Sequence, residues 1–100
     1  MEYLVEFEVH IPVGTPDSAV SRRLAAEAVA AANLAKKGDL IRLRKTPDES
    51  RALGLFRADN RAELDAFLAD LPLYVWLHVT VTALEPHPND PGASQEIPRP

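Results

Sequence analysis

The stretch LPLYVWLHVTVTAL, residues 71–84, holds the end of a helix followed by a complete strand. Pro72 ends the helix, because a proline inside a helix removes a hydrogen bond and clashes with the preceding turn. From residue 75 the side chains alternate between two faces, which predicts a strand over residues 75–84. One face consists of Val75, Leu77, Val79, Val81 and Ala83, and the other of Trp76, His78, Thr80, Thr82 and Leu84.

The N-terminal part of the chain predicts another strand and a long helix. Residues 3–11, YLVEFEVHI, alternate in the same way, so this strand also has one buried face. Thr15 is expected to cap the helix, with Pro16 at its first position. The helix should run to about Lys37, where Gly38 supplies the stop.

The middle of the chain predicts a hairpin and a second helix. Residues 39–45 and 51–57 are typical of strands, and the turn TPDES joins them at residues 46–50. Asn60 and Glu63 resemble a capping pair at the start of the second helix. The order β-α-β-β-α-β predicts an α+β, ferredoxin-like fold, in which a four-stranded antiparallel sheet carries two helices on one face.

This arrangement leaves the second face of the sheet uncovered. That face would carry Trp76 and Leu84 among polar groups, and a partner subunit is expected to cover it. The tail from Glu85 has five prolines in sixteen residues, which predicts an extended arm that could lie on a neighbouring chain. We therefore expect a domain over residues 1–88 and an extended or disordered Pro-rich tail over residues 89–100.

Composition limits the classes of function. At 100 residues one domain is expected, and no long apolar run or secretory segment occurs, which predicts a cytoplasmic protein without a membrane partner. The absence of cysteine excludes thiol nucleophiles and thiolate metal sites, and the three histidines are far apart, so no metal is expected. A net charge of −4 argues against a nucleic-acid partner, although local positive charge still allows a small anionic ligand.

Glu27 is the candidate catalytic residue. The first helix has an apolar sector formed by Val20, Leu24, Ala31 and Leu34, and a polar side opposite it formed by Arg22, Arg23, Asn33, Lys36 and Lys37. Glu27 lies within the apolar sector, where burial raises the pKa of a carboxyl group toward the value that a general base needs. Its alanine neighbours would leave room for a ligand. Equally, Glu27 could pair with Arg42 or Arg44, or lie at the helix edge.

Two further groups are candidates for binding. Arg42, Arg44 and Lys45 form a basic stretch on the second strand, which is typical of an exposed edge protected against aggregation. The alternative is recognition of an organic carboxylate, for which arginine offers a bidentate fork. His87 lies between two prolines that restrict its freedom, although a polar turn would explain it equally well.

The segment LPLY at residues 71–74, followed by Trp76 and the pair at residues 87–88, resembles the muconolactone Δ-isomerase family, which also includes chloromuconolactone dehalogenases. The likeness covers about residues 1–88 without a gap. Single matching positions are Ile11, Pro12, Glu27, Gly38, Leu43, Lys45, Phe56, Leu64 and Leu84.

The resemblance implies a ferredoxin-like fold, no cofactor, and a ring-like homo-oligomer built from dimers, up to a decamer, with sites between subunits. It implies an isomerase of aromatic-compound catabolism, in the beta-ketoadipate pathway, that moves a proton within a small unsaturated lactone. Glu27 matches the family's carboxylate. The expected substrate-binding residues are Arg44, Lys45, Ser50, Trp76 and His87.

The chain departs from the usual family pattern at the pocket. Family members usually carry tryptophans where this chain has Leu40 and Arg44, and a tyrosine and an asparagine where it has Ser50 and Ala52. Because such residues shape the pocket and supply hydrogen bonds, the departures imply a different small lactone or acid as substrate.

Two hypotheses about function follow. The first is a cofactor-free isomerase in which Glu27 carries the proton, while Arg44, Lys45 or His87 holds a substrate carboxylate. The second is a diverged, non-catalytic oligomeric module that binds a small acid or only assembles. The second hypothesis predicts that the surroundings of Glu27 are collapsed or salt-bridged.

Overall fold

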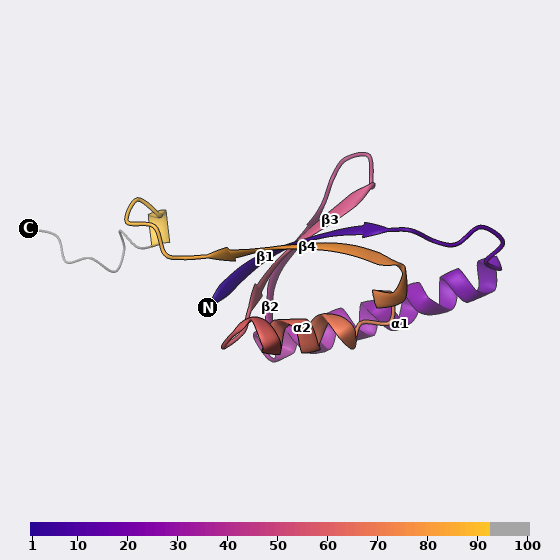
Figure 1. Ribbon diagram of the computed structural model, residues 1–100, viewed down its shortest axis with the longest axis horizontal. Helices are drawn as coiled ribbons and strands as arrows, with labels where there is room; N and C mark the ends of the chain where they lie inside the picture. Colours follow the sequence, from indigo (N-terminus) through magenta and orange to yellow (C-terminus); the bar gives the residue numbers. More distant parts are fainter. Residues whose placement is uncertain (93–100) are drawn as a thin grey trace, which may run out of the picture.

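The computed structural model describes residues 1–92 and has the order β-α-β-β-α-β. The elements are β1 (Glu2–Val9), α1 (Asp17–Lys36), β2 (Leu40–Lys45), β3 (Arg51–Arg57), α2 (Arg61–Ala69), the short 3₁₀ helix η1 (Tyr74–Trp76) and β4 (Leu77–Leu84). The strands lie in the order β2-β3-β1-β4, and each neighbouring pair is antiparallel. Both helices cover the same face of the sheet (Figure 1), so the expected α+β, ferredoxin-like fold is confirmed.

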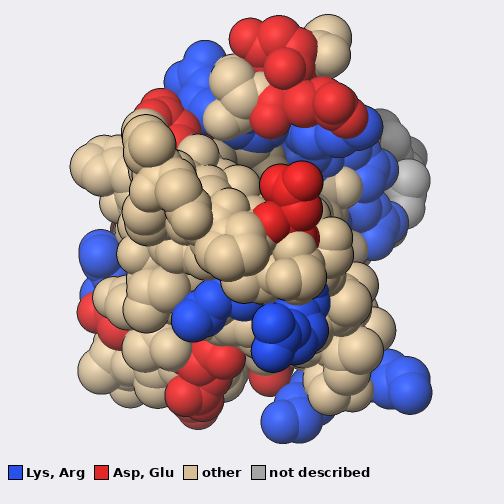
Figure 2. Space-filling model, turned by 90° about the vertical axis from the view of Figure 1, so that its right-hand side faces the viewer, with Lys and Arg blue, Asp and Glu red and all other residues tan. Residues whose placement is uncertain are grey.

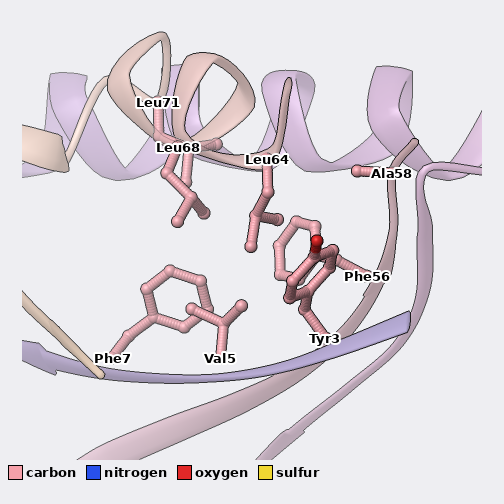
Figure 3. Close-up of a cluster of buried hydrophobic side chains, with 8 residues drawn as sticks. All are labelled: Tyr3, Val5, Phe7, Phe56, Ala58, Leu64, Leu68 and Leu71. Atoms are coloured by element: carbon pink, nitrogen blue, oxygen red, sulfur yellow. The ribbon is translucent and has the colours of Figure 1, made fainter. Parts of the chain in front are cut away.

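The core lies between the sheet and α2 (Figure 3). Alternation along β1 directs Tyr3, Val5 and Phe7 toward the helices, where Leu64 and Leu68 of α2 pack on them. Val5 and Leu64 are fully buried. Burying one such side chain contributes about 1.5–3 kcal/mol to the free energy of unfolding.

The C-terminal end of α1 is capped as predicted, whereas its N-terminal end is not. Gly38 has a positive φ of 80°, and the backbone N–H of Asp39 donates to the carbonyl oxygen of Leu34 (2.9 Å), as in a Schellman motif. The prediction that Thr15 caps the helix is wrong, because Pro16 occupies the capping position. The Thr15 hydroxyl instead donates to the carbonyl oxygen of Pro12 (2.7 Å), within the turn that precedes the helix.

The last strand begins two residues later than predicted. Residues 74–76 form η1, since the N–H groups of Tyr74 and Trp76 donate to the carbonyls of Leu71 and Leu73. This turn directs Trp76 toward α1, where the guanidinium carbon of Arg23 lies 5.0 Å from the centre of the indole ring. The expectation that Trp76 lies on the uncovered face of the sheet is therefore wrong.

The opposite face of the sheet carries half-buried leucines and charged residues. Glu2 lies near Arg57 (3.7 Å) and Glu6 near Arg51 (3.9 Å), and each pair joins neighbouring strands. These exposed ion pairs contribute little to stability.

Beyond β4 the chain leaves the sheet (Figure 1). It turns at residues 88–89, where the N–H of Asp90 donates to the carbonyl of His87 (3.0 Å). The remainder of the expected tail, residues 93–100, lies outside the described residues. Within residues 1–92, neither α1 nor α2 combines the length and apolar character that crossing a membrane requires.

Candidate active site

Glu27 projects from the middle of α1 toward a cavity of about 150 Å³ between the helices and the sheet. The cavity is lined by Phe7 and Val9 of β1, Ala31 and Leu34 of α1, Leu40 and Leu43 of β2, Ala52 and Phe56 of β3, Leu71 and Leu73 of the segment after α2, and Leu77 of β4. Every lining side chain other than Glu27 is apolar. The arrangement therefore places one carboxyl group against an otherwise apolar space.

One hydrogen bond holds the carboxylate in this position. The backbone N–H of Leu73 donates to Oε1 of Glu27 (3.0 Å), and Leu73 itself is buried. Burial raises the pKa of Glu27 above its ordinary value of 4.5, while the hydrogen bond from Leu73 acts in the opposite direction and is the weaker influence. A raised pKa brings a carboxyl group closer to the range in which it can both take and return a proton.

The basic residues of β2 do not neutralise Glu27. Arg42 donates to the carbonyl of Ile41 (2.7 Å), and Arg44 donates to that of Leu43 (2.9 Å). Among the ion pairs formed within residues 1–92, none includes Glu27. The alternative of an ion pair between Glu27 and Arg42 or Arg44 is therefore absent from the described part of the chain.

The cavity has the size of a single ring. An apolar protein cavity of about 150 Å³ is large enough to bind benzene. A five- or six-membered ring would therefore fit beside the carboxylate, and its C–H bonds would face Glu27 across an apolar space. Low polarity in such a space strengthens the interaction between the carboxylate and any charge that develops on the guest.

Gly54 was not recognised from the sequence, although it allows the packing of Phe7 and Phe56, which line this cavity. Phe7 and Phe56 meet there edge to face, with ring centres 6.1 Å apart. A Cβ atom on Gly54 would come within 2.6 Å of the Phe56 ring, so only glycine allows this packing. A glycine inside a predicted strand is the sequence signal that could have revealed the close approach.

Lys45 and Arg44 lie on opposite faces of the sheet. Lys45 pairs with Ala52, which lines the cavity, whereas Arg44 pairs with Leu53, whose side chain belongs to the other face. The ammonium group of Lys45 forms an ion pair with Glu49 at the rim of the sheet. Neither residue lines the cavity within one chain.

The other predicted binding residues also lie outside the cavity. Ser50 donates from its hydroxyl to Oδ1 of Asp48 (2.8 Å), and hydrogen bonds from Thr46 and Ser50 lower the pKa of Asp48 to about 2. Trp76 contacts Arg23, as described above. His87 accepts a hydrogen bond at Nδ1 from the N–H of Asn89 (3.0 Å), in the arm beyond β4. Of the six predicted site residues, Glu27 alone lines the cavity.

These features define the class of protein: a ferredoxin-like α+β domain with a single carboxylate facing an apolar cavity. Residues 1–90 match the sequence profile of the family described as "Muconolactone delta-isomerase". The chain belongs to the muconolactone delta-isomerase family, and is thus related to isomerases.

Two muconolactone delta-isomerases match this chain over most of its length. The muconolactone delta-isomerase of Acinetobacter baylyi is 26% identical over 89 residues, which cover 89% of this chain and 93% of the relative. That of Cupriavidus pinatubonensis is 29% identical over 89 residues, which cover 89% of this chain and 97% of the relative. The match therefore spans nearly the whole of both proteins.

Solved structures confirm the fold. A muconolactone isomerase crystal structure superposes with a TM-score of 0.84 at 23% identity, covering 91% of this chain and 95% of that chain. The 5-chloro-2-hydroxyhydroquinone dehydrochlorinase of Burkholderia phenoliruptrix superposes with a TM-score of 0.58 at 16% identity, covering 85% and 94%.

Proposed function

We propose that this chain is a cofactor-free isomerase of aromatic-compound catabolism in the cytoplasm, which moves a proton within a small unsaturated lactone related to muconolactone. The observation that carries the proposal is Glu27, a carboxylate that forms no ion pair within residues 1–92 and faces a cavity of single-ring size. The names of its relatives support the same reaction. A non-catalytic module would be expected to have a collapsed or salt-bridged Glu27, so the open cavity favours the enzyme.

The proposed reaction needs only one proton carrier. Glu27 takes a proton from a ring carbon of the lactone, and the electron pair of the broken C–H bond spreads into a dienolate. The protonated Glu27 then returns the proton to the carbon next to the carbonyl group. No proton or electron is gained or lost overall, so the step needs no oxidant or reductant.

The negative oxygen of the dienolate requires a hydrogen-bond donor or a cation. The Leu73 N–H already donates to Glu27, and the other groups lining the cavity are apolar side chains. We assign this role, and the binding of any substrate carboxylate, to residues at the rim or from a second subunit. Lys45 is the rim residue on the cavity face, while Arg44, Ser50, Trp76 and His87 are candidates to reach a neighbouring subunit's cavity.

Turnover of a lactone tests the proposal directly. We expect the protein to isomerise muconolactone, or a related unsaturated lactone, without an added cofactor. In D₂O the product should acquire deuterium next to the carbonyl group to the extent that Glu27 exchanges with solvent before it returns the proton. Ultraviolet absorbance follows the isomerisation, and proton NMR follows the deuterium. A protein that neither isomerises any lactone of a panel nor exchanges its C–H protons would refute the isomerase.

We further propose a homo-oligomer built from dimers, because a large apolar surface stays exposed in one chain. No residue of α1 is buried, and Leu24 and Val29 on this helix are 50% and 63% exposed. Val13 and Val75 are also largely exposed. Residues other than Lys, Arg, Asp and Glu cover much of the end of the molecule that Figure 2 shows. Exposed patches of this kind are typical of subunit interfaces.

The oligomer predicts a particle mass well above that of one 11.0 kDa chain. Light scattering coupled to size-exclusion chromatography should give a multiple of at least two. Removing residues 85–100 should reduce the number of subunits per particle, because the arm beyond β4 is expected to lie on a neighbour. A monomer at micromolar concentration would refute the oligomer, and an unchanged number of subunits after truncation would refute the role of the arm alone.

A further inference from the structure

One peptide group links Glu27 to a cation. Glu27 accepts a hydrogen bond from the N–H of Leu73 (3.0 Å), and the carbonyl oxygen of the same peptide group, that of Pro72, accepts one from Nη1 of Arg23 (2.6 Å). Arg23 and Glu27 are four residues apart on α1, so their side chains project from the same side of the helix, about 40° apart. The expectation that Arg23 lies opposite Glu27 is therefore wrong.

Arg23 is held in this position by a second contact. Its guanidinium carbon lies 5.0 Å from the centre of the Trp76 ring, which belongs to η1 immediately after the bridging peptide. Among the ion pairs of residues 1–92, none includes Arg23. Within the described residues, the guanidinium group of Arg23 therefore makes its hydrogen bond to the Pro72 carbonyl and not to a carboxylate.

A cation at the carbonyl oxygen changes the other end of the peptide group. It draws electron density toward the oxygen, which makes the N–H a stronger donor, since hydrogen bonds in a chain polarise one another. A stronger donor favours the ionised carboxylate over the neutral acid. The side chain of Arg23 is exposed, so water reduces the direct effect of its charge on Glu27, and the effect through the peptide becomes relatively more important.

Few other charges within residues 1–92 can act on Glu27. The sheet strands and the segment just after α2 contribute only apolar side chains to the cavity, namely Phe7, Val9, Leu40, Leu43, Ala52, Phe56, Leu71 and Leu77. The segment at residues 71–76 contributes one ionisable side chain, that of Tyr74, which is 44% exposed and does not line the cavity. Arg23 is thus the cation connected to Glu27 through hydrogen bonds.

We propose that Arg23 is a positioning residue, which acts through the Pro72–Leu73 peptide group to aim the Leu73 N–H at Glu27 and to keep Glu27 ionised. Its catalytic consequence rests on the proposed function. Its effect on the Glu27 carboxyl group does not, because that effect exists in the protein without substrate.

Carbon-13 NMR titration of the Glu27 carboxyl group tests the proposal without any turnover. Glu27→Gln identifies the resonance, because its signal is lost in that variant. Arg23→Met keeps a long apolar side chain but removes the charge and the donors, so the titration midpoint should move to higher pH. Arg23→Lys, which keeps the charge, should restore part of the difference. Arg22→Met is the matched control on the exposed side of α1 and should leave the midpoint unchanged.

The outcomes are distinct. An unchanged midpoint in Arg23→Met, or an equal change in Arg22→Met, would overturn the proposal whether or not the protein is an isomerase. If Arg23→Met does not fold, as judged by circular dichroism, Arg23→Gln provides the same comparison with a neutral donor. In an active enzyme, Arg23→Met should also move the acid limb of the pH–rate profile to higher pH. It should lower kcat about tenfold to a hundredfold, since displacement of a reacting group by about 1 Å can cost about 10²-fold.

Discussion

Replacing Glu27 with Gln is expected to lower kcat by about 10²- to 10⁴-fold, the usual contribution of a general acid–base residue. Glutamine has nearly the same shape and can still accept the Leu73 hydrogen bond, but it cannot take a proton. The fold should therefore survive while the proton transfer slows. Stopped-flow absorbance and deuterium exchange measure the loss, and circular dichroism verifies the fold.

A control substitution separates the loss of a negative charge from the loss of the catalytic base. Glu2→Gln removes a carboxylate that lies outside the cavity, near Arg57 on the sheet. It should leave kcat within a factor of two. Normal turnover by Glu27→Gln would show that the proton moves by another route, and the assignment of Glu27 would have to be abandoned.

Glu27→Gln should also change how the stability of the fold depends on pH. Burial raises the pKa of Glu27 in the folded protein above its ordinary value of 4.5. The folded state then binds its proton more tightly than the unfolded state, so this residue makes the protein lose stability as pH rises from 4.5 through the folded pKa. Glu27→Gln removes that loss, so its melting temperature should equal or exceed that of the wild type at pH 8. At pH 4 this advantage should disappear.

Filling the cavity should have a similarly large effect on activity. Ala31 lies one turn after Glu27 and lines the cavity, so Ala31→Leu places three more carbon atoms in a space of about 150 Å³. A ring substrate would then lose its place beside the carboxylate. We expect kcat/KM to fall by about 10²-fold or more, because a misplaced substrate loses alignment with the base.

Ala31→Leu should raise the stability of the fold or leave it unchanged, although it lowers activity. Filling a cavity commonly adds about 0.5–2 kcal/mol to the free energy of unfolding. Ala32→Leu is the control, because Ala32 is exposed and does not line the cavity. Chemical denaturation and steady-state kinetics measure the two effects. Full activity of Ala31→Leu would mean that the substrate binds somewhere other than this cavity.

The departures from the family pattern acquire a physical meaning in the structure. Leu40 and Ala52, two of the positions at which the resemblance implied larger residues, both line the cavity. Ser50 instead stabilises the turn between β2 and β3, and Arg44 faces the other side of the sheet. The substrate specificity of this chain is thus expected to depend on the first pair, which determine the shape of the cavity.

The local pattern of residues predicted the order of the helices and strands, and it singled out Glu27 as the candidate catalytic residue. Alternation in β1 and β4, the glycine that ends α1 and the cap of α2 each act over a few residues, so they can be read without knowing the rest of the chain. A carboxylate within the apolar sector of a helix is equally visible. Boundaries were less certain, as Thr15 and η1 illustrate, because turn hydrogen bonds there compete with the regular pattern.

The surroundings of Glu27 were decided only by the tertiary structure. Pro72 and Leu73 are more than forty residues away from Arg23 and Glu27 along the chain, yet the peptide group between them contacts both side chains. No local pattern specifies such a contact, since it depends on how α2 and η1 pack over α1. The sequence therefore indicated which carboxylate is the candidate base, and the fold determined that it meets an apolar cavity and the Leu73 N–H instead of Arg42 or Arg44.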